Sequence, residues 1–343
     1  MSARAGLAQA LARTNALRRG LGAEHAASGR HKEWFHVCLE LEEETILCNF
    51  SLMERGQRDP AARVALLWRG ERWQGDVFGV PLSECTAQAG SLDLGFGENR
   101  FWQEGAELCL RVVSPRGDRV LEARLTPLSP PTLPSSIRLG PGAAMHWVVV
   151  PRLSARGSVR VNGQVRHFAD AIAYHDHNWG DFSWGHGFRW DWGYVCPPDS
   201  PWALVVVRVS DGPGHRTLSQ GVLVWRDDVQ VRTFQDAEIV VAQQGSLRQH
   251  IVHQIPPVLR LAAPGSASGV PAETVWRAQG RQDALEIRFR ARDHAQVLIP
   301  SDDDPSGLTR LNEVYGRYLI TGRIAGEPIA LDHAGVLEHV RHG

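Results

Sequence analysis

The chain has 343 residues, a formal net charge of −1 and a hydrophobic content of 43%, so it can bury the cores of two domains. A nucleic-acid-binding protein normally carries a basic excess or a basic face, and this sequence has neither, so we expect no nucleic-acid partner. No apolar run reaches the ~20 residues that a membrane-spanning helix needs. We therefore expect a soluble protein of the cytoplasm.

The first 30 residues are rich in Ala, Leu and Arg and lack the continuous apolar core of a signal peptide. This composition predicts a short amphipathic helix at the N-terminus. The five cysteines are odd in number and contain no Cys-x-x-Cys pair. They therefore indicate buried free thiols in a reducing compartment, and argue against a disulfide framework or a zinc ribbon.

From about residue 31 the sequence changes to short runs of β-branched and aromatic residues bounded by Gly, Pro, Asp or Asn, which is typical of strands. Asn162-Gly163 predicts a tight hairpin turn, Gly326-Glu327-Pro328 a second turn, and the Pro-rich segment Thr126–Gly142 a long loop. Many short strands at regular spacing favour an all-β fold of barrels or sandwiches over a parallel α/β sheet. The clearest runs are Trp34–Leu41, Arg63–Arg69, Leu108–Val113, Met145–Val150, Ser158–His167, Trp202–Val209, Gly221–Trp225, Ala284–Arg290 and Tyr318–Ile324.

The segment Ala171–Val195 holds three His, three Asp and four Trp within 25 positions. A core strand does not tolerate so many polar groups without a purpose, whereas a ligand pocket needs polar and aromatic side chains together. A hydrogen-bonded network that ties two sheets together is the alternative interpretation. If the segment is extended, one face carries His175, His177 and Trp179 and the other carries Tyr174, Asp176 and Asn178.

Residues Gly157–Asp181 resemble the signature of the carotenoid 1,2-hydratase (hydroxyneurosporene synthase) family, with a Gly-x-Val-x-Val-Asn-Gly hairpin and an Ala-Tyr-x-Asp-His-x-Trp-Gly strand. The early Lys32–Val37 and the closing Gly322–Glu338 are also similar to that family. The resemblance implies two lipocalin-like β-domains with a hydrophobic pocket, here residues 31–185 and 186–343 after an N-terminal helical extension, residues 1–30. The wider group includes decalin-forming Diels–Alderases.

Hydration of an alkene needs a general acid that protonates carbon, after which water captures the carbocation. Asp176 is the predicted acid, with His177 as a proton relay and Tyr174 orienting the water or a substrate oxygen. The second-choice catalytic candidates are Asp181, Asp191 and His186, and Glu33 and His36 could reach the same cavity. The predicted substrate-binding residues are Trp34, His175, Asn178, Trp179, Trp184, Trp190 and Trp192.

We therefore expect a cofactor-independent hydro-lyase that acts on an isoprenoid, polyene or polyketide, with transient contact at a membrane surface for substrate pickup. A pericyclase and a non-catalytic carrier of a hydrophobic ligand are the alternatives. A third, metal-dependent alternative rests on His175 and His177, which superficially resemble a cupin ligand pair followed by Asp181; no downstream cupin box accompanies them, so we predict no metal site. Neither a Gly-x-Ser-x-Gly elbow nor a Gly-x-Gly-x-x-Gly fingerprint occurs.

Overall fold

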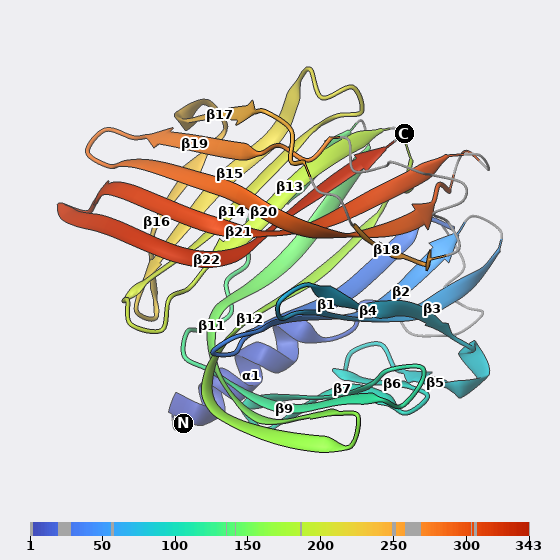
Figure 1. Ribbon diagram of the computed structural model, residues 1–343. Coiled ribbons are helices and arrows are strands. Elements are labelled where there is room, and N and C mark those ends of the chain that lie inside the picture. The colour runs from blue at the N-terminus through green and yellow to red at the C-terminus, as the bar shows by residue number, and fades with distance from the viewer. Residues whose placement is uncertain are drawn as a thin grey trace. The chain divides into compact units, whose positions relative to one another are not determined.

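The structure is a computed structural model (Figure 1), and it describes residues 3–19, 29–55, 58–134, 136–140, 142–185, 187–248, 252–257, 269–302, 304 and 307–342. It consists of one N-terminal helix and two largely antiparallel sheets, one of them nearly closed, which confirms the predicted all-β class. By its contacts the chain divides into unit 1, Met1–Ser136 with Ala143–Phe182, and unit 2, Ile137–Gly142 with Ser183–Gly343. The predicted folding domains, residues 31–185 and 186–343, stay a prediction, because contacts alone do not test independent folding.

Unit 1 contains the helix and a sheet of strands in the order β4-β3-β2-β1-β12-β11-β9-β8-β7-β6-β5. The chain therefore runs through two meanders, and β1 and β12 join them as neighbours. The elements are α1 (Ala3–Asn15), β1 (His31–Glu40), β2 (Thr45–Arg55), β3 (Arg58–Arg69), β4 (Trp73–Val80), the short 3₁₀ helix η2 (Leu82–Glu84), β5 (Cys85–Ala87), β6 (Asp93–Phe96), β7 (Asn99–Glu104), β8 (Glu107–Val113), β9 (Arg119–Pro127), β11 (Ala143–Val161) and β12 (Gln164–Asp181).

Helix α1 packs against the apolar core of unit 1. Its Leu11 is completely buried in that core, and Leu17 follows it just beyond the helix. Figure 1 shows α1 between the β1–β12 side and the β7–β9 side of the sheet. The amide of Gln103 donates a 2.9 Å hydrogen bond to the carbonyl of Ala8, which ties the helix to β7. Helix α1 is thus part of the fold of unit 1.

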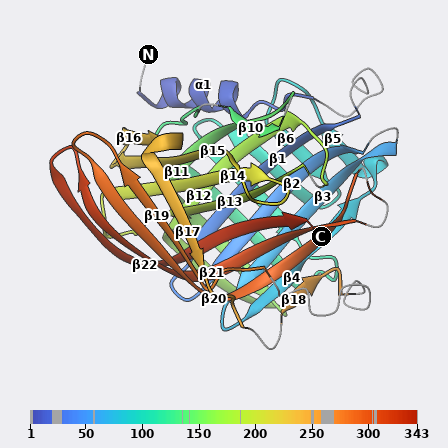
Figure 2. The same cartoon turned by 90° about the horizontal axis from the view of Figure 1, so that it is seen from above.

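Unit 2 has a second sheet, in the order β16-β15-β14-β13-β22-β21-β20-β19-β17, with β18 paired in parallel to β20. Its core includes Trp276, Phe289 and Tyr318. Figure 2 shows its neighbouring strands β20, β21 and β22 from above. The elements are β10 (Ile137–Gly140), β13 (Phe188–Val195), β14 (Trp202–Asp211), β15 (Thr217–Arg226), β16 (Val229–Gln235), the 3₁₀ helix η3 (Asp236–Glu238), β17 (Ile239–Gln244), β18 (His253–Ile255), β19 (Glu273–Gln279), β20 (Ala284–Pro300), β21 (Leu308–Ile324) and β22 (Glu327–His342).

The turns follow the sequence closely, with two differences. Asn162 and Gly163 adopt φ of 49° and 84° and close the β11–β12 hairpin as predicted. The last hairpin turns one residue earlier than predicted, because Ala325 and Gly326 take the positive φ values and Glu327 already begins β22. The predicted loop Thr126–Gly142 also contains the short strand β10.

All five cysteines are free thiols, and Cys85 alone among them is partly exposed. No helix in the described ranges is both long enough and apolar enough to cross a membrane.

Gly157 marks a close approach between β11 and β9. A Cβ atom at this position would lie 2.0 Å from the carbonyl oxygen of Glu122. We expect Gly157→Ala to lower the free energy of unfolding by about 1–3 kcal/mol, the usual cost of overpacking. Denaturant titration measures it.

Gly6→Ala in α1 is the matched control, because no atom lies within 4 Å of the added Cβ. There the change should stabilise the helix by up to ~1 kcal/mol. Equal unfolding midpoints for the two variants would contradict the β11–β9 packing.

Candidate active site

Asp176 lies at the centre of a hydrogen-bonded group on β12. Its Oδ2 accepts a 2.8 Å hydrogen bond from the Tyr174 hydroxyl, and its Oδ1 accepts a 2.5 Å hydrogen bond from the Asn178 amide. Tyr174 is completely buried, and Asp176 and Asn178 are each 4% exposed. Asp176 is therefore a buried carboxyl whose two oxygens are each held by a side chain of its own strand.

The neighbouring strands add aromatic groups on the same face. Trp34 on β1 and Trp147 on β11 lie directly opposite Asn178, and His36 on β1 lies opposite Asp176. Residues in such pairs have Cβ atoms about 4.5–5.5 Å apart. Burial lowers the pKa of His36 to about 4, which keeps its imidazole neutral at pH 7. We call these six residues the Asp176 face: Trp34, His36, Trp147, Tyr174, Asp176 and Asn178.

Trp147 gives this face a polar group that the described chain leaves unused. Its side chain is 3% exposed, and its indole Nε1 is buried without a hydrogen-bond partner among the described residues. Buried N–H groups in folded proteins nearly always have a partner. A ligand with an acceptor atom would supply one here.

The alternate residues of β12 project from the opposite face, into the core of unit 1. The His177 ring stacks on Phe35 with their centroids 4.0 Å apart, and the His175 ring lies 5.5 Å from Phe101. Burial lowers the pKa of His175 to about 3. Its Nδ1 lies 2.9 Å from the carbonyl oxygen of His36 and its Nε2 2.9 Å from the Asn15 side chain. His175 is therefore a neutral ring that joins the end of α1 to β12.

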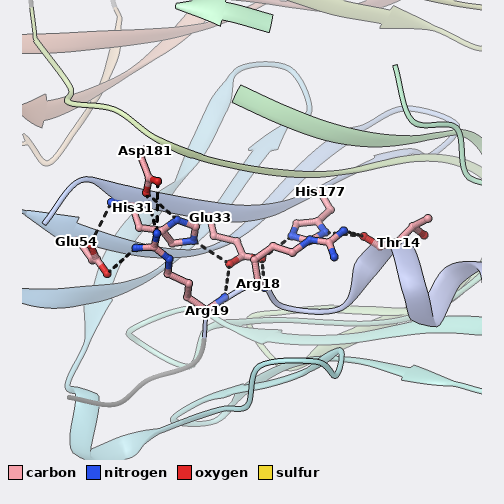
Figure 3. A network of polar contacts seen from close by, with 8 residues as sticks. All are labelled: Thr14, Arg18, Arg19, His31, Glu33, Glu54, His177 and Asp181. Carbon is pink, nitrogen blue, oxygen red and sulfur yellow. Dashed lines mark hydrogen bonds and ion pairs between the residues drawn. The ribbon is translucent and has the colours of Figure 1, made fainter. Parts of the chain in front are cut away.

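His177 connects the same helix to β1 (Figure 3). Its Nδ1 lies 3.1 Å from the carbonyl oxygen of Thr14, and its Nε2 lies 2.7 Å from Glu33 Oε1. A carbonyl oxygen can only accept, so Nδ1 must carry a proton. Burial lowers the pKa of His177, and the neighbouring Glu33 carboxylate opposes that effect. His177 thus contacts α1 through one ring nitrogen and Glu33 on β1 through the other.

Glu33 accepts hydrogen bonds from the segment that follows α1 as well. The backbone N–H of Arg18 donates to it over 2.7 Å and that of Arg19 over 3.2 Å, and His31 Nε2 lies 3.1 Å away (Figure 3). Burial alone would raise the pKa of Glu33, but the hydrogen bonds from His177 and His31, the charge of His177 and the backbone bond lower it to about 2. Glu33 is therefore ionised at neutral pH.

The structure does not bring His177 together with Asp176, because their side chains leave opposite faces of β12. Trp179 shares the His177 face, where the Arg18 guanidinium lies 4.2 Å from its ring centroid. A proton relay between Asp176 and His177 has no support in this geometry, and the roles in catalysis stay predictions.

The other candidates are spread over the fold. Asp181 lies near His31 and Arg19, with its Oδ1 3.3 Å from His31 Nδ1, whereas Asp191 is buried in unit 2 and His186 lies outside the described residues. Within the described part of the chain, no three His, Cys, Asp or Glu side chains are grouped as metal ligands.

The predicted Trp184, Trp190 and Trp192 belong to unit 2, where they reveal an acid that the motif did not indicate. The centroids of Trp184 and Trp190 are 5.1 Å apart. Trp190 Nε1 donates a short hydrogen bond to the Glu338 carboxyl, and Trp192 lies directly opposite Glu338.

Glu338 is paired across β21 and β22 with a second acid, Glu313. Burial raises the pKa of Glu338 to about 7, although hydrogen bonds from Trp190 and Glu313 oppose the rise. A carboxyl with such a pKa can both give and take protons near neutral pH. In the sequence, Glu338 stands beside His339 among the apolar residues of Val336–Val340. A charged residue in an apolar strand is the only sequence signal for this acid, and the motif does not indicate it.

These features define an all-β protein of the lipocalin-like class, with acid groups on its strands. Comparison of the sequence with protein-family profiles finds no match, and neither does comparison with curated proteins.

Solved structures share the fold at low sequence identity. The putative AttH from Nitrosomonas europaea is similar over 93% of this chain and 94% of its own, with a TM-score of 0.63 and 16% identity. Kievitone hydratase from Nectria haematococca is similar over 96% and 97%, with a TM-score of 0.62 and 11% identity. CghA in complex with Sch210972 is similar over 91% and 89%, with a TM-score of 0.58 and 13% identity.

The Glu33 network makes a prediction about acid stability. Its pKa is about 2 in the folded protein, below the ordinary 4.5, so it stabilises the fold above pH 4.5 and this contribution is lost as the pH falls towards 2. We expect Glu33→Gln to cost about 3 kcal/mol at pH 7 and progressively less below pH 4.5. Denaturant titrations across this pH range measure the effect. The exposed Glu71→Gln is the control, and a constant cost for Glu33→Gln at every pH would contradict the network.

The raised pKa of Glu338 predicts the opposite dependence of stability on pH. Because its pKa is raised in the folded protein, the fold holds a proton that the unfolded chain releases above pH 4.5, and stability falls as the pH rises from 4.5 through 7. Glu338→Gln should remove this part of the fall. Comparing the pH dependence of the unfolding midpoints of the parent and the variant tests it. Identical curves would place the Glu338 pKa at its ordinary value.

Proposed function

We propose that the protein is an enzyme that acts on a hydrophobic small molecule by acid–base chemistry, adding water to an alkene or removing it, without an organic cofactor. The observation that carries the proposal is the Asp176 carboxyl, which accepts hydrogen bonds from Tyr174 and Asn178 on a face that also holds Trp34 and Trp147. Kievitone hydratase, which its name describes as a hydratase, supports hydration as a reaction of this fold.

Asp176 and Tyr174 would work as one proton-transfer unit. In its neutral form the carboxyl gives its proton to the Tyr174 oxygen as the Tyr174 hydroxyl gives its own to one alkene carbon. The other carbon becomes a cation and Asp176 a carboxylate. Water then attacks the cation, its surplus proton returns to Asp176 through the same hydroxyl, and the enzyme is restored. The reverse sequence removes water.

The aromatic residues would stabilise the charged intermediate. The face of a Trp ring attracts a cation, and each such contact contributes about 0.5–2 kcal/mol. The neutral imidazole of His36, opposite Asp176, would position the water. Asn178 holds the carboxyl oxygen that the tyrosine does not contact.

The substrate class follows from the resemblance of Gly157–Asp181 to carotenoid 1,2-hydratases, which makes an isoprenoid or polyene our first choice and a polyketide our second. A cytoplasmic location and substrate pickup at a membrane surface belong to the same proposal. Cyclisation of a related substrate is the second candidate, because a protonated alkene is captured by another double bond when water is excluded. CghA, solved with the small molecule Sch210972, supports a ligand site in this fold.

The first experiment extracts small molecules that copurify with the protein from its natural host. The extract and a panel of isoprenoid alkenes are then incubated with enzyme in water labelled with heavy oxygen, and the products are analysed by mass spectrometry. A product that gains labelled oxygen identifies hydration. An isomer without the label identifies cyclisation, and bound but unchanged ligand would leave the carrier alternative.

Asp176→Asn should lower turnover by at least ~100-fold, because general acid–base catalysis typically contributes 10²–10⁴-fold. Asp170→Asn is the matched control, since Asp170 is exposed on the same strand and its positive φ of 57° suits Asn. Tyr174→Phe should show a loss similar to that of Asp176→Asn if the two groups act as one unit. Full turnover by Asp176→Asn would remove Asp176 from the mechanism.

A further inference from the structure

Unit 2 carries a row of polar residues across the inner face of its sheet. Leu337 lies two residues from His339 and Val314 two residues from Asn312, so these two core residues share the face of the row. Neighbours in the row are directly opposite each other on adjacent strands, and none is more than 6% exposed. The row consists of Gln254 on β18, Gln296 on β20, Asn312 on β21, His339 on β22 and Asp191 on β13.

Hydrogen bonds connect the row from end to end. Gln254 donates to Gln296, and Gln296 donates to Asn312, each over 2.9 Å. Asn312 donates to the carbonyl of His339 over 3.0 Å, and His339 Nδ1 lies 2.6 Å from Asp191 Oδ1. Such a network fixes each side chain, so the groups at its end are held in place.

Next to this row, on the same face, stand three arginines. Arg310 on β21 lies directly opposite Arg341 on β22. Arg189 on β13 precedes the pair Trp190–Val340 by one residue. Burial lowers its pKa and the charge of Arg341 adds to this effect, whereas Asp211 and Asp191 oppose it. Like charges on adjacent strands destabilise a sheet. The arrangement therefore has a cost that needs a compensating negative charge.

Two of the three arginines have a carboxylate that acts on them, because Asp191 bonds to Arg341 and the charges of Asp211 and Asp191 both raise the pKa of Arg189. Arg341 bonds to Asp191 at 2.5 Å and donates to the carbonyls of Trp190 and Val340. In the described part of the chain, Arg189 and Arg310 make neither a hydrogen bond nor an ion pair, and the Nε of each is buried without a partner.

The His339 ring also has a buried polar atom without a partner among the described residues. Its side chain is completely buried, and its Nε2 has no hydrogen-bond partner among the described residues. Burial lowers the pKa of His339, Asp191 opposes this, and Arg341 adds to the lowering. His339 in turn lowers the pKa of His294, the other titratable ring near it. A buried ring nitrogen of this kind lacks the partner that a ligand oxygen would supply.

We propose that unit 2 binds an oxyanion, the carboxylate or phosphate group of a small molecule, at Arg310, with Arg341 and His339 on the adjacent strand beside it. Guanidinium groups match the geometry of both anions, because their N–H donors can bond two oxygens in parallel. The exposed Gln243, whose amide donates to Asp191 Oδ2 over 3.1 Å, lies at the accessible end of this group. The site is built from residues of unit 2 and does not depend on the proposed function.

The test titrates inorganic phosphate, and in a second arm acetate, into the full-length protein at constant ionic strength. Calorimetry measures the affinity for each anion, and a change in the NMR signals of the His339 ring shows that the anion binds near that ring. A bound anion favours the imidazolium, so we expect the pKa of His339 to rise. The anion that binds more tightly, phosphate or acetate, shows whether the site prefers a phosphate or a carboxylate group.

Arg310→Gln should weaken binding at least about tenfold, since it removes charged hydrogen bonds. In buffer free of phosphate and acetate, the same variant should unfold at a higher temperature than the parent, because it relieves the repulsion with Arg341. The matched control is Arg317→Gln on the same strand, where Arg317 is exposed and paired with Asp332. It should bind as the parent does.

Two results would overturn the proposal. One is the absence of binding for both anions, or binding that leaves the His339 ring signals unchanged. The other is an equal loss of affinity in Arg310→Gln and Arg317→Gln, which would indicate non-specific attraction to surface charge. Arg310→Lys, which keeps the charge and loses the fork of donors, should bind with intermediate affinity.

Discussion

The fold of unit 1 depends on one buried carboxylate. Glu33 accepts hydrogen bonds from two backbone N–H groups after α1 and contacts two imidazoles from β1 and β12. An ionised carboxylate away from water is stable only with such a set of donors. These contacts fix the end of the helix, and the helix in turn covers the apolar interior that Leu11 completes. The polar side chains of β12 that face inward are therefore already used by the fold.

The alternation of β12 gives the strand two separate tasks. Residues of one parity, His175 and His177, hold the helix, and residues of the other parity, Tyr174 and Asp176, form a hydrogen-bonded acid group. A one-residue slip in register would exchange the two sets and would bury the wrong groups. Pairing with both β1 and β11 along the strand excludes that slip.

The sequence predicted those parts of the structure that depend on local pattern. The turn at Asn162-Gly163, the strand class and the two faces of β12 follow from spacing alone, and the structure agrees. It could not predict which face of β12 meets the helix, because the partner Glu33 lies 144 residues from His177. For the same reason Glu338 was missed, since its raised pKa comes from burial and from neighbours on other strands. Long-range pairing decides both cases.

The order of the strands also determines how the chain can fold. β1 is completed only when it pairs with β12, and β13 only when it pairs with β22, so each sheet joins its first strand to its last long one. Contacts between residues so far apart in the sequence slow folding. The long loop between the two strands loses conformational entropy when it closes, and this loss comes before the contacts can stabilise the chain. During synthesis β1 therefore waits, with one edge unpaired, until residue 181 has left the ribosome. In that interval the unpaired edge of β1 can pair with the edge strand of another chain.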